Sequence, residues 1–291
     1  MKVDKFRTVI IYIIIILLGL VCLLPLLNIV AISFSSSAAV EGNMVGLIPV
    51  GFSTAAYEKI LEDSQFWHSF LISVERVVLA LIINFVLIVL MAYPLSKTNA
   101  QFRGRNIYAN LMIFAMLFNG GMIPTFLVVK SYGLLNTVWA LVLPGAVPIF
   151  NVILVMNFFA AVPKELEEAA FIDGANPLQV LTKIFIPISK PVLATVSLFS
   201  IVGSWNDFYS GLIYMSKAAY YPLMTYIQSL QINVEDLIKQ GNLSAVVDSA
   251  SLGNTNLNAA KIVIAVIPLL LIYPLLQRYF VSGIVVGSVK G

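Results

Sequence analysis

The sequence KELEEAAFIDGANPLQVLTKIFIPISK, from Lys164 to Lys190, is a charged segment inside an apolar part of the chain. No Asp, Glu, Lys or Arg occurs from Ser131 to Pro163 before it, or from Pro191 to Asn206 after it. A membrane-spanning helix needs roughly 20 mostly apolar residues, so the flanking stretches are candidates for spans. The pattern therefore predicts a polar module at the membrane surface between two spans.

The composition of the whole chain is typical of a membrane protein. Of its 291 residues, 60% are hydrophobic and 11% are charged, whereas soluble domains carry about 45–50% apolar and about 25% charged residues. The net charge of +3 comes from scattered basic residues, so no nucleic-acid partner is expected. Cys22 and His68 are the only residues of their types, which excludes an intrachain disulfide and argues against a metal site.

Six apolar segments have about the length that a bilayer requires. They occupy residues 8–34, 77–96, 107–129, 138–162, 191–215 and 258–280. The last segment is the weakest, and we expect Lys261 and Arg278 to extend from its two ends to the membrane surface. Residues 1–291 are thus predicted to form a single, all-α transmembrane domain.

The orientation of the domain follows from the basic residues of the short connections. They precede the first span and follow the second, fourth and sixth: Lys2, Lys5, Arg7, Lys97, Arg103, Arg105, Lys164, Lys183, Lys190, Arg278 and Lys290. Both termini are therefore expected to be cytoplasmic and the 217–261 loop extracellular. The first segment is expected to be retained, because its apolar run exceeds the roughly 7–15 residues of a signal peptide core.

The loop at 163–190 carries the local signals of two short helices. Gly174 suits a left-handed helix stop, and Asn176-Pro177 provides an N-cap followed by a first-position proline. A repeat at i, i+3 and i+7 predicts one apolar face made of Leu178, Leu181 and Phe185. Such a module could be a rigid knob for a soluble partner, or an interfacial helix pair that contacts only lipid headgroups.

The spacing in this loop resembles the EAA motif of ABC importer permeases. The matching residues are Glu168, Ala169, Ala170, Gly174, Ile184, Ile186 and Pro187, with Ile186 where leucine is more usual. Three further stretches are similar to the carbohydrate-uptake permeases of this family, in particular to the MalG-like branch and its LplC-type subunits for complex saccharides. These stretches are Asn119–Thr125, Trp205–Asp207 and Gln277–Gly291.

The resemblance implies a type I ABC importer permease fold in a bacterial plasma membrane. It implies a second, homologous permease subunit, two ATP-binding subunits that dock on the EAA residues, and an extracellular solute-binding lipoprotein. The substrate would be a saccharide, either an oligosaccharide or a polysaccharide fragment. ATP and Mg²⁺ would bind to the partner chains, and this subunit would hold no cofactor and no catalytic residue. In agreement, the sequence has no Gly-x-x-x-x-Gly-Lys-Ser/Thr phosphate loop.

Ionisable groups inside a membrane are costly, so each is a candidate for function. Asp207 lies in the fifth predicted span beside Trp205, Asn206 and Tyr209. Aromatic rings with carboxylate and amide groups suit a saccharide, so these four residues are the candidates for the sugar pathway. The other interpretation is an interfacial aromatic belt or packing between permease subunits. Glu75 and Arg76 are expected to lie at the interface and to pair with each other.

Other polar positions in the predicted spans are less specific. They could line an aqueous cavity or hold helices together; they are Asn84, Pro144, Pro148, Asn151 and Asn157. In the 217–261 loop, Leu223, Ile227 and Leu230 predict an amphipathic helix at the outer surface. The segment from Asn242 to Asn258 is expected to meet the binding protein, and the alternative is a loose surface loop.

Two other functional classes remain as alternatives. A gradient-driven secondary transporter would need buried carboxylates or histidines and inverted repeats, and only Asp207 is a candidate for such a group. A membrane enzyme would need a convergent nucleophile, acid–base pair or metal set, which the charged residues of this chain do not supply.

Overall fold

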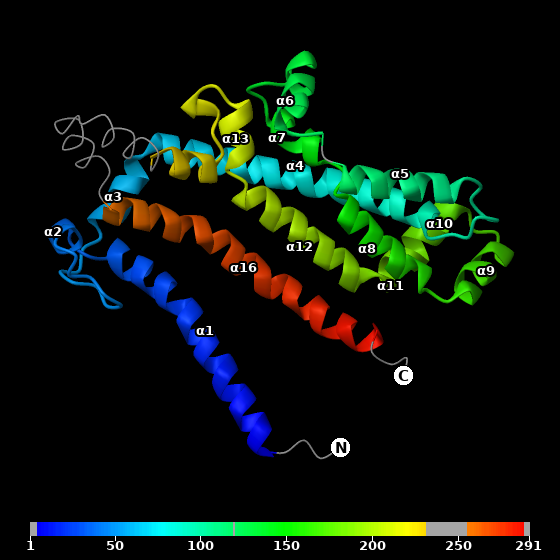
Figure 1. The fold of residues 1–291 in the computed structure, drawn as a ribbon, viewed down its shortest axis with the longest axis horizontal. Helices are drawn as coiled ribbons and strands as arrows, with labels where there is room; N and C mark the ends of the chain where they lie inside the picture. The colour runs from blue at the N-terminus through cyan, green and yellow to red at the C-terminus, as the bar shows by residue number, and fades with distance from the viewer. Residues whose placement is uncertain (1–4, 119, 231–254, 288–291) are drawn as a thin grey trace. The chain divides into compact units, whose positions relative to one another are not determined.

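The computed structural model describes residues 5–118, 120–230 and 255–287, and this part of the chain is helical with no strand (Figure 1). Three helices are long: α1 (Lys5–Ser33), α4 (Ser64–Leu95) and α16 (Thr255–Gly287). Each contains a stretch long and apolar enough to cross a membrane, at Thr8–Ser33, Ser64–Leu95 and Thr255–Leu275. The first, second and sixth predicted spans lie in these helices.

The remaining candidate spans are bent helix pairs. Helices α5 (Arg105–Leu117) and α6 (Met122–Ser131) make an angle of 112°. Helix α7 (Val138–Val142) continues into the 3₁₀ turn η1 (Leu143–Gly145). Together they make an angle of 47° with α8 (Ile149–Ala160). Residues 177–188 and α12 (Lys190–Asn206) are bent by 84°. Within the described residues, counting each pair as one span gives up to six, which fits the predicted number.

The breaks occur where the sequence weakens a helix. Gly121, directly before α6, has a φ of +91°, a conformation that side chains disfavour. Pro144 and Pro148 separate α7 from α8, because proline lacks the backbone N–H that a continuous helix requires. Span five is also divided: α12 ends at Asn206, and α13 (Tyr209–Tyr214) follows Asp207 and Phe208.

The chain divides into two compact units. The first contains α1, α2 (Ser37–Glu41), α3 (Ala55–Glu62) and the first part of α16. The second contains most of α4 and all elements from α5 to α13. The second unit also contains the 3₁₀ turn η3 (Ala218–Tyr220) and the part of α16 from Leu269 onward. A helix over residues 223–230 is divided between the two units after Thr225.

The core of the second unit is formed by α4, α8, α12 and the helices of the 163–190 loop. Its most buried side chains, each at most 1% exposed, include Ala92, Val152, Val155, Val180 and Val196. Because Val180 lies in the loop, the second half of the charged block is part of this core rather than an attachment to it.

In the first unit, Lys261 is buried instead of extending to the membrane surface as predicted. Its Nζ lies 2.7 Å from Asp63 Oδ2 and donates to the Tyr226 hydroxyl at 3.2 Å. Burial alone would raise the pKa of the Asp63 carboxyl, but the hydrogen bonds from Lys261 and the Phe66 amide bring this pKa below its usual value. The prediction failed because the partner, Asp63, lies 198 positions earlier in the sequence.

The structure has a helix at 223–230, as predicted, but it shows no exposed polar side, since none of its residues is exposed and Thr225 is fully buried. Leu223 is fully buried and Ile227 is 6% exposed. Burial raises the pKa of the Tyr226 hydroxyl on the same helix, and the Asp63 carboxylate raises it further. Residues 231–254 lie outside the described residues, and they include most of the 242–258 segment that is expected to meet a binding protein.

The second predicted span starts earlier than the sequence indicated. It was placed at 77–96, whereas α4 begins at Ser64. The 13 additional residues include His68, Glu75 and Arg76, which interrupt the apolar pattern and so resemble a loop in sequence. Arg76 is only 4% exposed, because its guanidinium has partners within the second unit.

Candidate functional site

The first half of the 163–190 loop is the helix α9 (Lys164–Ile172). Glu165 and Glu167 lie in its first turn, where acidic groups interact favourably with the helix dipole. The helix ends at Asp173, and Gly174 follows with a φ of +81°. The predicted left-handed stop is therefore confirmed, and only glycine adopts this conformation without a steric penalty.

The second half consists of α10 (Pro177–Val180), the π turn η2 (Leu181–Phe185) and α11 (Ile186–Ile188). Asn176 is the predicted N-cap: its Oδ1 accepts from the Gln179 amide at 2.9 Å, and Gln179 Oε1 accepts from the Asn176 amide at 2.9 Å. This reciprocal pair satisfies two backbone donors that the helix start would otherwise leave unbonded.

The predicted apolar face of this second half is partly wrong. Leu181 and Phe185 are each 3% exposed, but Leu178 is 61% exposed and Val180 is buried in its place. Leu178 and Val180 lie in α10, before the π turn, and are two positions apart, which is about 200° around a helix. A helix that buries Val180 in the core therefore exposes Leu178.

The EAA residues divide into an inner and an outer set. Ala170, Ile184 and Ile186 pack against the core of the second unit. The outer set is exposed and consists of Glu168, Ala169, Gly174 and Pro187. Large apolar side chains beside it are also at least 44% exposed: Leu166, Phe171, Ile172 and Leu178. These side chains are therefore available for contacts outside this chain.

A polar cluster joins α9 to the end of α4. Lys97 Nζ lies 2.6 Å from Glu167 Oε1, and the Tyr93 hydroxyl donates to the same oxygen at 3.2 Å. The ammonium group also lies 4.1 Å from the centre of the Tyr93 ring and 4.2 Å from that of Phe185. Burial lowers the pKa of Lys97, and the Glu167 carboxylate opposes this shift. Sequence reasoning missed this cluster, since nothing local links residues 70 positions apart.

A polar cavity of about 260 Å³ lies among α4, α7, α8, α12 and α13. Its polar lining includes Arg76, Asn84, Asn151, Ser200, Ser204 and Asp207. Pro144 and Pro148 also line it. Four of the five span residues that the sequence singled out as lining a cavity or holding helices together therefore line this cavity. Asn157, the fifth, is exposed elsewhere on α8.

Asp207 is held at the break between α12 and α13. The Arg76 guanidinium forms an ion pair with the carboxylate of Asp207 and donates to its backbone carbonyl. Ser210 donates to the same carboxylate through its hydroxyl at 2.5 Å and its amide at 3.1 Å. The expected pairing of Arg76 with Glu75 is therefore wrong, and among the described residues the Nε of Arg76 has no partner.

The other three candidates for the sugar pathway do not line this cavity. Trp205 is 5% exposed and packs edge-on against Phe70, with ring centres 5.6 Å apart. Asn206 is exposed, and the Tyr209 hydroxyl lies 3.0 Å from the sulfur of Met122. Of the four predicted sugar-pathway residues, only Asp207 therefore lines the polar cavity, and the aromatic residue that lines it with Asp207 is Tyr214.

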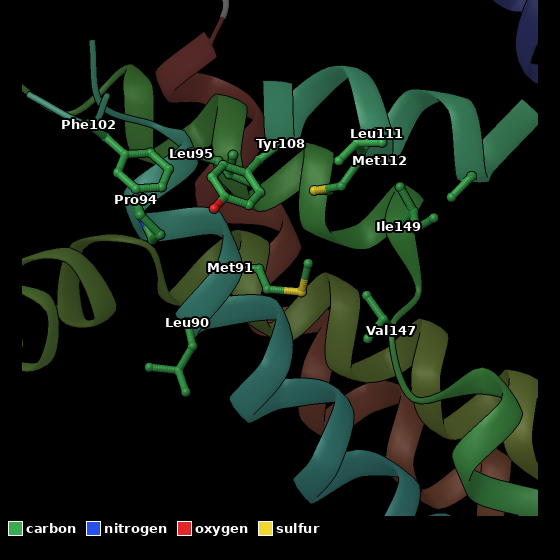
Figure 2. A pocket seen from close by; sticks show the side chains of 11 residues that line it. Leu90, Met91, Pro94, Leu95, Phe102, Tyr108, Leu111, Met112, Val147 and Ile149 are labelled. Atoms are coloured by element: carbon green, nitrogen blue, oxygen red, sulfur yellow. The ribbon is translucent and has the colours of Figure 1, made fainter. Parts of the chain in front are cut away.

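A larger cavity, of about 430 Å³, lies between the end of α4, α5 and the start of α8. Figure 2 shows that its walls are apolar side chains such as Leu95, Met112 and Ile149. A ligand rich in hydroxyl groups would lose its hydrogen bonds to water there without replacement. The smaller, polar cavity is therefore the better candidate for a saccharide.

The comparison with known proteins identifies the family. Residues 77–286 match the binding-protein-dependent transport system inner membrane component. The chain belongs to this family. The match covers the core of the second unit, the 163–190 loop and most of α16. The chain is therefore a transporter permease subunit located in a membrane, as the EAA resemblance predicts.

Individual relatives extend the match over almost the whole chain. Protein LplC of Bacillus subtilis (strain 168) is 41% identical over 273 residues, 94% of this chain and 91% of LplC. The polygalacturonan/rhamnogalacturonan transport system permease protein YtcP of the same organism is 40% identical over 288 residues, 99% of each chain. The crystal structure of a bacterial ABC transporter involved in the import of the acidic polysaccharide alginate matches with a TM-score of 0.83 and 32% identity, over 96% of this chain and 98% of that chain. These similarities confirm the type I ABC permease fold.

Proposed function

We propose that this chain forms half of the translocation pathway of an ATP-driven saccharide importer, with oligosaccharides or polysaccharide fragments as substrates. The similarity to YtcP over the full length of both chains carries this proposal. The relation to an importer of alginate supports the same substrate class. The import direction is consistent with the EAA motif of the 163–190 loop.

The polar cavity is the proposed part of the sugar pathway in this subunit. The Asp207 carboxylate is occupied by Arg76 and Ser210, so its role is to hold the cavity wall while neighbouring amide and hydroxyl groups contact the sugar. Asn151 and Ser204 are suitable groups, since both line the cavity. At about 260 Å³, the cavity is smaller than the roughly 300–1,000 Å³ of most ligand pockets. A second permease subunit would complete it.

The exposed residues of α9 and the turn after it are the proposed binding surface for an ATPase subunit. Glu168, Ala169 and Gly174 are accessible there, and the small side chain at 169 lets a partner approach the helix backbone. Ile172, at 86% exposed, supplies apolar area for the contact. This subunit would thus be non-catalytic, with ATP and Mg²⁺ on two partner chains and an extracellular binding protein delivering the saccharide.

A gradient-driven transporter is the alternative that the experiment must exclude. Among the described residues, Asp207 is the one carboxylate that lines the polar cavity, and it is already paired with Arg76. A proton- or sodium-coupled site would need a carboxylate whose charge can be neutralised during transport. The ion pair therefore favours the ATP-driven mechanism.

The test is extraction in a mild detergent followed by co-purification and ATPase assay. We expect a second permease and an ATPase to accompany this chain, and a saccharide-loaded binding protein to stimulate ATP hydrolysis. Uptake should be abolished by a phosphate-loop mutation in the ATPase and should persist with a protonophore. Isolation of the chain alone, with uptake that a protonophore abolishes, would overturn the proposal in favour of the gradient-driven transporter.

A further inference from the structure

Helix α9 has one buried side chain, and this side chain is acidic. Glu167 is 8% exposed, whereas the apolar residues Leu166, Phe171 and Ile172 of the same helix are 44%, 44% and 86% exposed. Ala170 alone adds a partly buried apolar contact with the core. Apolar packing therefore contributes little to holding α9 against the rest of the unit, and the polar contacts of Glu167 take that role.

The partners of Glu167 come from two other elements. Lys97 and Tyr93 belong to the end of α4 and the turn that follows it, and both bind Glu167 Oε1. Phe185 of η2 lies against the Lys97 ammonium on one side and packs edge-on against the Tyr93 ring, with ring centres 5.1 Å apart. One cluster of four side chains thus connects α9, α4 and η2.

The geometry of the cluster makes it a stiff connection. The side chains of Lys97 and Glu167 are only 12% and 10% exposed, so water screens their attraction weakly. The two aromatic rings beside the ammonium add cation–π attraction and restrict its position. If α9 moves while the ion pair is retained, the end of α4 has to move with it, because separating the charges would leave both uncompensated.

We infer that the Lys97–Glu167 ion pair is the linkage through which displacement of α9 by an ATPase subunit reaches α4, the helix that carries Arg76 and Asn84 of the polar cavity. This inference rests on the proposed function, since it needs an ATPase that moves α9. Lys97 and Glu167 are positioning residues in this mechanism, because neither touches substrate or nucleotide. Tyr93 supports them by orienting the carboxylate.

The test uses the complete importer, reconstituted in liposomes, and measures saccharide transported per ATP hydrolysed. We expect Lys97→Met and Glu167→Gln to assemble and to hydrolyse ATP, with the transport-to-hydrolysis ratio about tenfold lower than in the wild type. The charge exchange Lys97→Glu with Glu167→Lys should recover part of the ratio, because attraction returns while the aromatic contacts of the ammonium are lost. Lys130→Met and Glu62→Gln, the same changes at exposed positions, should leave the ratio unchanged.

A milder variant covers the case in which the single changes prevent assembly. Tyr93→Phe keeps the ring and removes only the hydroxyl that donates to Glu167. We therefore expect this variant to assemble. Its transport-to-hydrolysis ratio should be reduced by roughly fivefold, the lower end of typical coupling effects. An unchanged ratio in all assembled variants would overturn the linkage. Loss of assembly in Tyr93→Phe as well would also overturn it, by showing that the cluster serves folding alone.

The proposed function and the linkage are distinguished by different outcomes. If the wild-type complex itself shows no saccharide-stimulated ATP hydrolysis, the proposed function is wrong. If the wild type transports saccharide and the variants keep its ratio, the proposed function stands and only the linkage is wrong.

Discussion

Arg76 and Asp207 are 131 positions apart in the sequence, yet the guanidinium of the first binds both the carboxylate and the backbone carbonyl of the second. Arg76 also reaches the Leu141 carbonyl at 3.4 Å. One buried side chain of α4 thereby fixes the break between α12 and α13 and contacts α7. The wall of the polar cavity depends on this contact.

Replacement of Arg76 should be strongly destabilising. Arg76→Met leaves the Asp207 carboxylate in a partly buried place without its cation, and we expect the free energy of unfolding to fall by about 3–5 kcal/mol. Unfolding followed by circular dichroism in detergent measures this loss. The double variant Arg76→Met with Asp207→Leu should lose less than the sum of the two single changes. If the double variant lost the full sum of the two single losses, the interaction between Arg76 and Asp207 would contribute nothing to the free energy of unfolding.

A bulky charge on the outer surface of α9 should uncouple the transporter. Ala169 is exposed, so Ala169→Arg can fold and insert, while its long side chain keeps a partner from the helix backbone. We expect normal amounts of the subunit in the membrane, loss of co-purified ATPase and no uptake. Ala169→Ser, which adds a single oxygen, serves as the matched control and should retain uptake. Wild-type uptake by Ala169→Arg would disprove the docking surface.

The polar cavity can be tested with two asparagines of one helix. Asn151 is 6% exposed and lines the cavity, whereas Asn157 lies on α8 outside it. We expect Asn151→Ala to raise the KM for uptake by about 10-fold, since loss of one hydrogen bond to a buried ligand costs about 0.5–1.5 kcal/mol and a bond poorly replaced by water costs more. Asn157→Ala should leave the KM unchanged. Equal values for both variants would remove the cavity from the sugar pathway.

The ion pair of the first unit predicts how stability depends on pH. The pKa of Asp63 is lowered from 3.8 in the folded state, so the folded state binds its proton less readily than the unfolded chain. This contribution to stability is present above pH 3.8 and is lost as the pH falls through the lower, folded-state pKa.

Lys261→Met should remove most of this pH dependence. The melting temperature of each protein is measured at neutral pH and at about pH 3. We expect the melting temperature of the wild type to fall more on acidification than that of the variant. Glu62→Gln, next to Asp63 but exposed, should behave as the wild type. A Lys261→Met protein with the full acid sensitivity of the wild type would contradict the assignment.

The sequence alone predicted the features that depend on local composition. Continuous apolar runs predicted α1, α4 and α16. The capping pair of Asn176 and Gln179 begins with a predicted N-cap, because a cap is decided by residues three positions apart. The EAA spacing predicted the family because its residues are also close together in the sequence.

Features that depend on distant residues were not predictable in this way. Arg76, Lys97 and Lys261 each find an acidic partner at least 70 positions away, and no local pattern indicates which of the available acids it will be. Trp205 and Tyr209 do not line the polar cavity with Asp207, because the chain breaks between α12 and α13, which a count of apolar residues does not reveal.

The π turn of η2 has a consequence for how this segment can change during evolution. Each residue added to or removed from a helix rotates everything beyond it by about 100°. Between Gly174 and Pro187 the chain must place Val180, Leu181 and Phe185 in the core while α9 keeps its outer surface free. Side chains there can be exchanged one at a time, but an insertion or deletion would turn the core residues outward. A change in the number of residues between the two ends of the loop should therefore disturb the fold more than most exchanges of a single side chain.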